Sequence, residues 1–189
     1  MKRKMHETRR LVIRPYRISD FATWHSAYVD RLPAQNAWDR GPMPAEECTK
    51  DDYRALVQRH EMLAREDQVY IYGIYTKDTT TLVGAIDIAV LCRQDRQWGN
   101  LGYQLHNRYW GNGYAQEAVP EAFRIAFLDL KLHRLEAAVN LRNTRSVELS
   151  RKIGMTYEGI KRNYLFENGA WVDHHLFTIT PEEIGIEVK

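Results

Sequence analysis

The chain has 189 residues, 44% of them hydrophobic and 28% charged, which is ordinary for a folded protein of one domain. Its 27 basic and 25 acidic residues leave a net charge of +2, too small for a nucleic-acid-binding surface. No stretch is apolar enough for a signal peptide or a transmembrane helix, so we expect a cytoplasmic protein with no membrane partner. We expect one domain over residues 1–189, in which residues 1–8 form a flexible basic tail.

The first half of the chain predicts a strand, two helices and then three strands. Ser19-Asp20 can cap a first helix that carries Phe21, Trp24 and Tyr28 on one face. We expect a strand at Leu11–Pro15, a loop at 31–45, a second helix from Thr49 to about Arg65, and further strands at Val69–Thr76, Leu82–Leu91 and Trp98–Leu105. Short polar turns between the last three strands indicate an antiparallel meander.

The second half of the chain alternates helices and strands. We expect a long helix from Tyr114 to about Leu130, a strand at Leu135–Asn140, a helix at Thr144–Ile153, and two strands at Thr156–Phe166 and Val172–Thr180. Asn168-Gly169 is a strong hairpin signal between the last two strands. No linker separates these elements, so the sequence predicts one mixed α/β domain.

The segment from Arg108 to Ala115 is the most informative one. Gly111 and Gly113 allow the backbone to turn tightly and approach a ligand. The N–H groups at the start of the following helix favour an anion, and Arg108 adds a positive charge. A P-loop would need Gly-Lys-Ser/Thr, and a Rossmann fingerprint a third glycine, and neither is present. The segment therefore predicts a pyrophosphate site, with a plain structural turn as the alternative.

Several ordered motifs resemble those of the GNAT acetyltransferases, especially their RimJ/RimL branch. The segment Arg108-x-x-Gly111-x-Gly113-x-Ala115 resembles the acetyl-CoA loop of that family. Further similar segments are Arg10–Pro15, Lys131–Ala137, Asn143-x-x-Ser146-x-x-Leu149-x-x-Lys152-x-Gly154-Met155, Glu158-Gly159 and Asn168-Gly169-x-Trp171-x-Asp173. The resemblance implies the α/β (α+β) GNAT fold, a mixed, mostly antiparallel sheet of about seven strands with about four helices and a splayed strand pair that binds acetyl-CoA.

The resemblance also implies an enzyme that transfers acetyl directly from acetyl-CoA to a primary amine. The RimJ/RimL branch favours the N-terminal α-amine of a protein, of the ribosomal-protein type, as acceptor. Two alternatives stay open: a small-molecule amine such as a polyamine or an aminoglycoside, and a non-catalytic acyl-CoA-binding sensor. The protein is expected to be a monomer or a homodimer.

The residues expected to bind acetyl-CoA follow from the same resemblance. The backbone of the strand end would face the pantetheine arm, the glycine loop would hold the pyrophosphate, and Asn143 would anchor the pantetheine. These residues are Gln104, Leu105, His106, Arg108, Gly111, Asn112, Gly113, Tyr114, Ala115, Asn140, Asn143 and Ser146.

Two residues are candidates for the chemistry, which needs a neutral amine and a proton for the leaving thiolate. Ser146 is implied as the thiolate acid; its alternative role is that of a residue in the cap region of a helix. Asp87 interrupts an apolar strand, where burial would raise its pKa, and it is our candidate for the base or for binding the amine. Its alternative is a solvent-facing side chain. Some family members carry a glutamate base near Tyr164–Phe166, but Leu165 stands in this segment.

No metal site is expected. Cys48 and Cys92 lie far apart in the sequence, without a Cys/His cluster, and His174 and His175 face opposite sides of a strand. Glu136 is expected to make structural hydrogen bonds, and Tyr164 is equally suited to packing and to a substrate contact. The aromatic residues Trp24, Tyr28 and Trp38 are predicted to lie in the core, with walls of the acceptor pocket as the alternative. The acids Glu46, Glu47, Asp51 and Asp52 are predicted to favour helix N-termini, with an acidic pocket for a polyamine as the alternative.

Overall fold

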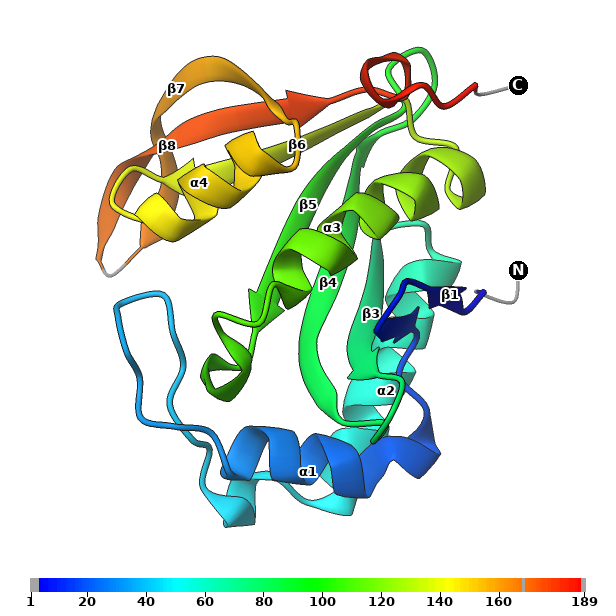
Figure 1. The fold of residues 1–189 in the computed structure, drawn as a ribbon, viewed down its shortest axis with the longest axis vertical. Helices are drawn as coiled ribbons and strands as arrows, with labels where there is room; N and C mark the ends of the chain where they lie inside the picture. Colours follow the sequence, from blue (N-terminus) through cyan, green and yellow to red (C-terminus); the bar gives the residue numbers. More distant parts are fainter. Residues whose placement is uncertain (1–3, 168, 188–189) are drawn as a thin grey trace. The chain divides into compact units, whose positions relative to one another are not determined.

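The computed structural model describes residues 4–167 and 169–187, which divide into two compact units. The first unit runs to Ile88 and resumes at Tyr103–Glu121, and the second comprises Ala89–Gly102 and the chain from Ala122 onward. Hydrogen-bonded strands of the described residues follow the order β1-β2-β3-β4-β5-β6-β8-β7 (Figure 1). A single domain over residues 1–189 stays a prediction.

The strands of the first unit begin with a short one that the sequence did not predict. They are β1 His6–Glu7, β2 Leu11–Arg14, β3 Val69–Thr76 and β4 Leu82–Cys92, whose last residues belong to the second unit. β2 pairs antiparallel with both β1 and β3. The expectation of a flexible tail over residues 1–8 is therefore wrong for residues 6–7, because these pair with Ile13 and Val12. Residues 1–3 lie outside the described part of the chain.

The helices of the first unit are α1 Phe21–Val29 and α2 Lys50–Arg65, each preceded by a 3-10 turn, Ile18–Asp20 and Ala45–Glu47. Thr49, the expected first residue of the second helix, is its N-cap and forms a capping box with Asp52. α2 packs on β3. The buried core of this region contains Tyr16, Trp24, Cys48, Tyr53, Val57, Tyr75 and Leu82.

A buried ion pair ties the start of α1 to the sheet. Arg14 on β2 donates to both carboxylate oxygens of Asp20, at 2.6 and 3.0 Å, and its guanidinium lies 3.9 Å from the ring centroid of Tyr75. Asp20 also accepts from the Arg17 N–H and the Tyr75 hydroxyl. Burial alone would raise the pKa of Asp20, but the hydrogen bonds from Arg14 and Arg17 lower it below its usual value.

The second unit contains most of β5 and the C-terminal strands. Its elements are β5 Trp98–Leu105, which ends in the first unit, β6 Arg134–Asn140, α4 Thr144–Lys152, β7 Thr156–Glu167 and β8 Ala170–Ile179. β6 runs antiparallel to β8 from Leu135 to Asn140. Its parallel register with β5 covers only three pairs, from Trp98↔Arg134 to Asn100↔Glu136. Asn168 of the expected hairpin turn lies outside the described residues.

The turn between β5 and the next helix contains the short 3-10 helix Asn107–Tyr109, labelled η3. Helix α3 then spans Tyr114–Arg124 and continues as a π-helical segment, Ile125–Asp129, close to the expected end at Leu130. The described residues form eight strands rather than about seven, because of β1. No helix within residues 4–167 and 169–187 is both long and apolar enough to cross a membrane.

We predict that Asp20→Asn lowers the free energy of unfolding by about 3 kcal/mol, because it leaves the buried Arg14 without its counter-charge. Urea denaturation followed by circular dichroism measures this change. Arg54→Ala is the matched control: Arg54 is half exposed and its pair with Asp51 lies on the surface, so the change is within about 0.5 kcal/mol.

The stabilisation by Asp20 also depends on pH. Because its folded pKa is depressed, the difference between wild type and Asp20→Asn is complete above about pH 4, near the pKa of an unfolded aspartate. It shrinks as the pH falls through the lower pKa of the folded protein. A difference that stays constant to the lowest pH at which both proteins fold would contradict the ion-pair assignment.

Candidate functional site

The loop after β5 has the backbone geometry of an anion site. Gly111 and Gly113 adopt the left-handed conformation, with φ of +78° and +74°. A side-chain carbon at Gly111 would meet nothing within 4 Å, so the backbone conformation rather than crowding requires glycine there. Gly111, Asn112 and Gly113 are all exposed. The first N–H groups of α3, which begins at Tyr114, have no partner inside the helix and favour a negative charge.

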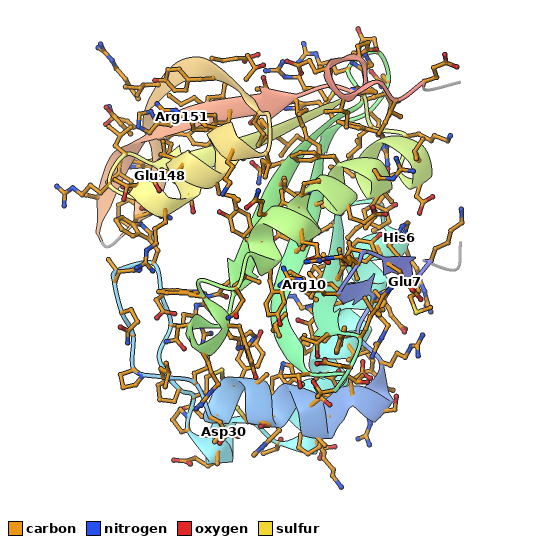
Figure 2. All side chains as sticks on the ribbon, viewed as in Figure 1. His6, Glu7, Arg10, Asp30, Glu148 and Arg151 are labelled. Atoms are coloured by element: carbon orange, nitrogen blue, oxygen red, sulfur yellow. The ribbon has the colours of Figure 1, made fainter. Side chains whose placement is uncertain are left out.

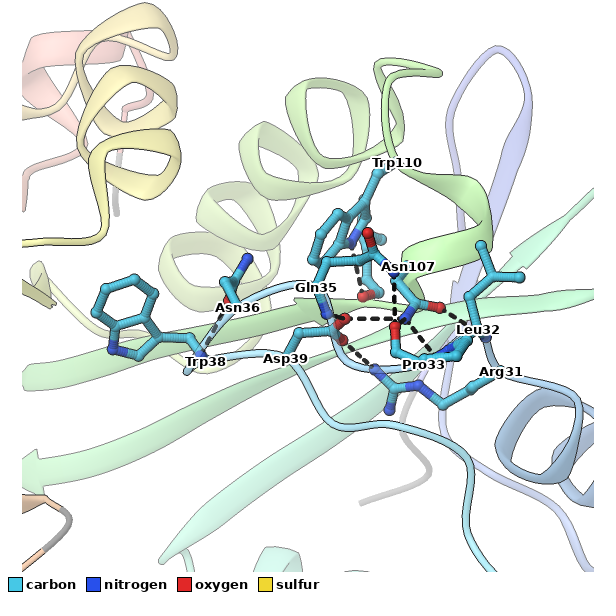
Figure 3. Close-up of polar contacts among 10 residues, drawn as sticks. Arg31, Leu32, Pro33, Gln35, Asn36, Trp38, Asp39, Asn107 and Trp110 are labelled. Carbon is cyan, nitrogen blue, oxygen red and sulfur yellow. Dashed lines mark hydrogen bonds and ion pairs between the residues drawn. The ribbon is translucent and has the colours of Figure 1, made fainter.

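Side-chain bonds hold this loop in shape. The Trp110 indole N–H donates to the Leu105 carbonyl at 3.0 Å (Figure 3). The Asn112 amide donates to the carbonyls of Tyr109 and Trp110, at 3.1 and 3.3 Å. These bonds restrain the loop, which lowers the entropic cost of binding.

A second arginine, Arg10, lies beside the loop, although its motif carried no expected role in the site. Arg10 follows β1 (Figure 2), and its Nη2 lies 3.6 Å from where a side-chain carbon of Gly113 would be. Its Nε and its backbone N–H donate to Glu117 of α3, each at 2.7 Å, and its guanidinium lies 4.7 Å from the Tyr114 ring centroid. Although burial alone would raise the pKa of Glu117, the bonds from Thr8 and Arg10 lower it. No local spacing predicts a contact across 107 residues.

Arg108, the predicted charge at the mouth of the loop, is exposed. Its Nη2 donates to the carbonyl of Asp30, at 2.7 Å, where α1 ends. The guanidinium therefore has a partner within its own unit in this structure.

The strand end before the loop is engaged with its neighbours. The His106 N–H donates to the Val83 carbonyl at 2.9 Å, and the Leu105 carbonyl accepts from Trp110. A side-chain carbon at Gly84 would lie only 2.3 Å from the Gln104 carbonyl oxygen, so glycine allows this close approach. The expectation that the His106 backbone faces a ligand is therefore not met for its N–H group in this structure, because that group pairs with β4.

Asp87 lies on β4, on the same face as Ala85, which packs against the core of the first unit. Its side chain is half buried, and burial raises the pKa of Asp87 above its usual value. Among the described residues it makes no hydrogen bond or ion pair. An unpaired carboxylate with a raised pKa has the properties of a general base.

A pocket of about 810 Å³ also lies within the first unit. It is lined by α1, by the turn Thr79–Thr81 and by residues of η3. His106 lines it and is buried, and burial, with the nearby charge of Arg31, lowers the pKa of His106 to about 4. The imidazole is therefore neutral at physiological pH.

In the second unit, the Asn143-x-x-Ser146 motif forms the start of α4. Asn143 is the N-cap, and its side-chain oxygen accepts from the Ser146 N–H at 3.3 Å. Ser146 is half buried in the first turn of the helix. Asn140 donates from its side chain to Glu167, at 2.6 Å, and accepts from the Arg142 N–H. The motif thus has a structural role, which leaves the proposed chemistry of Ser146 untested.

In the second unit, a buried histidine pairs with a partly exposed carboxylate, and the sequence did not predict this pair. His174 is buried, and its Nε2 lies 3.0 Å from Glu167 Oε1, while its Nδ1 lies 3.2 Å from the Val172 carbonyl. The Asn140 amide contacts the other oxygen of Glu167, and the Tyr164 ring lies 6.0 Å from that of His174. The feature of the sequence that could have indicated this pair is a histidine on a predicted strand, seven residues after Glu167.

The structure also bears on the predictions for Glu136 and for the aromatic residues Trp24, Tyr28 and Trp38. Glu136 is buried and pairs with Lys161 at 2.8 Å, which agrees with a structural role. Trp24 is in the core and Tyr28 packs against it, but Trp38 is 37% exposed, so its core assignment is wrong. Trp38 belongs to a loop whose residues 32–38 are all exposed. The described residues contain no group of three His, Cys, Asp or Glu side chains that could hold a metal ion.

Comparison with known proteins identifies a family for this chain. Residues 10–156 match the family described as acetyltransferase (GNAT) domain. The chain is 34% identical over 131 residues to the probable N-acetyltransferase YjcK of Bacillus subtilis (strain 168). This match covers 69% of this chain and 72% of that protein. It is 26% identical over 176 residues to the ribosomal protein uS5-alanine N-acetyltransferase of Escherichia coli (strain K12), covering 92% and 89%.

Solved structures share the fold. The Mycobacterium smegmatis RimJ in complex with CoA-disulfide has a TM-score of 0.79 at 23% identity, over 97% of this chain and 90% of that one. The ribosomal-protein-S5-alanine acetyltransferase from Vibrio fischeri has a TM-score of 0.78 at 24% identity, over 94% and 96%. At these levels of sequence identity, the structural similarity demonstrates the fold alone.

We predict that Gly113→Ala lowers the affinity for coenzyme A about five- to thirtyfold, since alanine disfavours φ of +74° by about 1–2 kcal/mol. Isothermal titration calorimetry measures the affinity. Gly154→Ala, at φ of +86° after α4 and with nothing within 4 Å of the added carbon, controls for backbone strain away from the loop. Equal affinities of Gly113→Ala and wild type would remove the loop from the coenzyme site.

Proposed function

The chain belongs to the GNAT acetyltransferase family and is an N-acetyltransferase, and we propose that its acceptor is the N-terminal α-amine of a protein. The observation that carries the proposal is the match, along nearly the whole length of both chains, to the enzyme named for the alanine of ribosomal protein uS5. Such an acceptor implies action in the cytoplasm, on a newly made protein or on a ribosomal protein.

We place the pyrophosphate of acetyl-CoA at the loop from Arg108 to Ala115. The support is the exposed left-handed backbone at Gly111 and Gly113, the start of α3, and the guanidinium of Arg10 beside Gly113. Acetyl-CoA supplies the acetyl thioester when it is bound. From the family likeness, Asn143 is assigned to the pantetheine arm and Ser146 to the proton of the departing thiolate.

Among the described residues, we consider two carboxylates as acceptors of the proton that the amine must lose. Asp87 is a half-buried carboxylate with a raised pKa and no partner among the described residues. The Glu167 carboxylate is hydrogen-bonded to His174 and Asn140, which fix its orientation. We assign the base to Asp87, because Glu167 is already committed to two partners and Asp87 is unpaired.

A polyamine acceptor is the less favoured alternative, because the acids that could bind it serve the start of α2. Asp52 accepts from the N–H of its N-cap residue Thr49, and Asp51 pairs with Arg54. Glu46 and Glu47 lie in the first turn of the preceding 3-10 helix. These carboxylates stabilise helix N-termini, as expected from the sequence.

The function is tested by measuring thiol release from acetyl-CoA with several amines. The panel contains peptides with free alanine or serine N-termini, the same peptides with blocked N-termini, spermine and an aminoglycoside. We expect release with at least one free peptide, and mass spectrometry should locate the acetyl group on its α-amine. The blocked peptides control for lysine acetylation.

Each other outcome has a clear meaning. Release with spermine or the aminoglycoside alone would overturn the protein acceptor and favour the small-molecule enzyme. Binding of acetyl-CoA without release, with any amine of a widened panel, would favour the acyl-CoA-binding sensor.

The assignment of the base predicts a pH dependence. A base acts only when deprotonated, so kcat/KM should fall as the pH drops through the raised pKa of Asp87. Asp87→Asn should lower kcat at least about a hundredfold and abolish this acidic limb, whereas Glu167→Gln should keep it. If Glu167→Gln loses the limb and Asp87→Asn keeps it, the base is Glu167.

A further inference from the structure

Three consecutive residues between β5 and Gly111 contact α1 or the segment that follows it. The ring of His106 meets that of Tyr28 on α1 edge-on, with centroids 5.0 Å apart. Arg108 donates to the carbonyl of Asp30. Between them, Asn107 contacts residues 32–39, as Figure 3 shows. We call these three residues the latch.

Both the oxygen and the amide nitrogen of the Asn107 side chain form hydrogen bonds to this segment. Its oxygen accepts from the Leu32 N–H at 3.1 Å. Its amide group donates to the carbonyls of Leu32 and Pro33, at 2.8 and 3.1 Å, and to Asp39 Oδ2 at 2.8 Å. The residue is buried, so these bonds replace water rather than compete with it.

Asp39 forms hydrogen bonds to other residues of its own loop. Its Oδ1 accepts from Arg31 Nη2 at 3.0 Å, and its Oδ2 accepts from the Gln35 N–H at 2.9 Å as well as from Asn107. The side chains of Arg31 and Asp39 are each only 1% exposed. A buried ion pair with such additional hydrogen bonds holds its geometry firmly, because each partner left alone would be an uncompensated charge.

Polar bonds, rather than apolar packing, connect the two segments. The pocket of about 810 Å³ is bounded by α1 and by η3 and is lined by Asp30, Arg31, His106 and Arg108. Residues 32–38 are exposed and do not bury an apolar face. The position of this loop relative to the glycine loop therefore depends on the latch and on the Arg31–Asp39 pair.

We propose that Asn107 is a positioning residue that couples the loop 31–39 to the coenzyme loop, so that acyl-CoA binding and ordering of the loop 31–39 strengthen each other. The coenzyme part rests on the proposed function. Asn107 directly precedes Arg108–Ala115, so a ligand that immobilises these residues stabilises the bonds of Asn107 to Leu32 and Asp39. By linkage, ordering the loop 31–39 favours the coenzyme to the same extent.

The coupling is tested first in the free protein by amide hydrogen exchange. The double variant Arg31→Met/Asp39→Leu removes both buried charges together and so leaves none unpaired. We expect exchange at residues 108–114, which comprise Arg108 of the latch and the glycine loop, to accelerate at least threefold. Asn36→Ala is the matched control: it removes the bond from the Trp38 N–H to Asn36 within the same loop, and it should leave residues 108–114 unchanged.

The second test adds coenzyme A to the full chain. In wild type, saturating coenzyme A should slow exchange at Leu32 and Gln35 at least threefold, and in Asn107→Ala this protection should be lost. In the same variant, KM for acetyl-CoA should rise at least fivefold while kcat changes less than twofold. A merely structural role of Asn107 would not remove a coenzyme-dependent protection.

The outcomes separate this proposal from the proposed function. Unchanged exchange at residues 108–114 in the double variant overturns the coupling, as does coenzyme binding that leaves Leu32 and Gln35 unprotected in wild type. If coenzyme A does not bind but the double variant accelerates exchange at residues 108–114, the coupling stands and the proposed function falls.

Discussion

The turn from β5 into α3 is the constraint on which the site depends. Gly111 and Gly113, which are separated by one residue, must take left-handed backbone conformations, which residues with a Cβ adopt only at a cost. This turn brings exposed backbone next to the start of a helix. The rest of the local structure supports it: Trp110 and Asn112 brace it from within, and Arg10 and Glu117 fix the first turns of α3.

Buried ion pairs are the second organising feature, and each connects two elements of the fold or the two ends of a loop. Arg14–Asp20 fixes the entry to α1, and Arg31–Asp39 fixes the loop after it. In the second unit, Glu136–Lys161 connects β6 with β7. A buried pair adds little net stability compared with apolar residues, but losing one partner is costly. These pairs therefore define which conformation the loops take more than they stabilise the fold.

The chemistry proposed for the enzyme follows from how the carboxylates differ. Asp20, Glu117 and Glu158 have donors that lower their pKa values and keep them charged. Asp87 has no partner among the described residues, and burial shifts its pKa in the opposite direction. An unpaired carboxylate with a raised pKa has an available lone pair and binds a proton more readily than these three do.

Local patterns predicted local structure well. The bounds of β3 and β5 agree with those predicted from their apolar and β-branched residues, and the helix predicted from Thr49 begins at Lys50 with Thr49 as its N-cap. The cap predicted at Ser19-Asp20 is wrong, because the Asp20 carboxylate bonds to Arg14 and makes no cap bond to α1. The glycine loop was also readable, because positive φ values have a residue signature. These features depend on a few neighbouring residues, and so they are visible in the sequence.

Contacts between distant segments were not predictable. Nothing in the sequence links Asn107 to Asp39, or Arg10 to Glu117. The His174–Glu167 pair was hidden by an irregular register: a regular hairpin from Glu167↔Ala170 would place Asn163 opposite His174, yet Lys161 lies there. Asn163 takes a φ of +46° at this bulge, a conformation that its short polar side chain tolerates.

The most direct test of this account is a crystal structure of the protein with coenzyme A. We expect the pyrophosphate oxygens to accept hydrogen bonds from the backbone N–H groups between Gly111 and Ala115, with Gly111 and Gly113 still left-handed. A coenzyme whose pyrophosphate is bound elsewhere, with this loop unoccupied, would contradict the account and reduce the glycine loop to a structural turn.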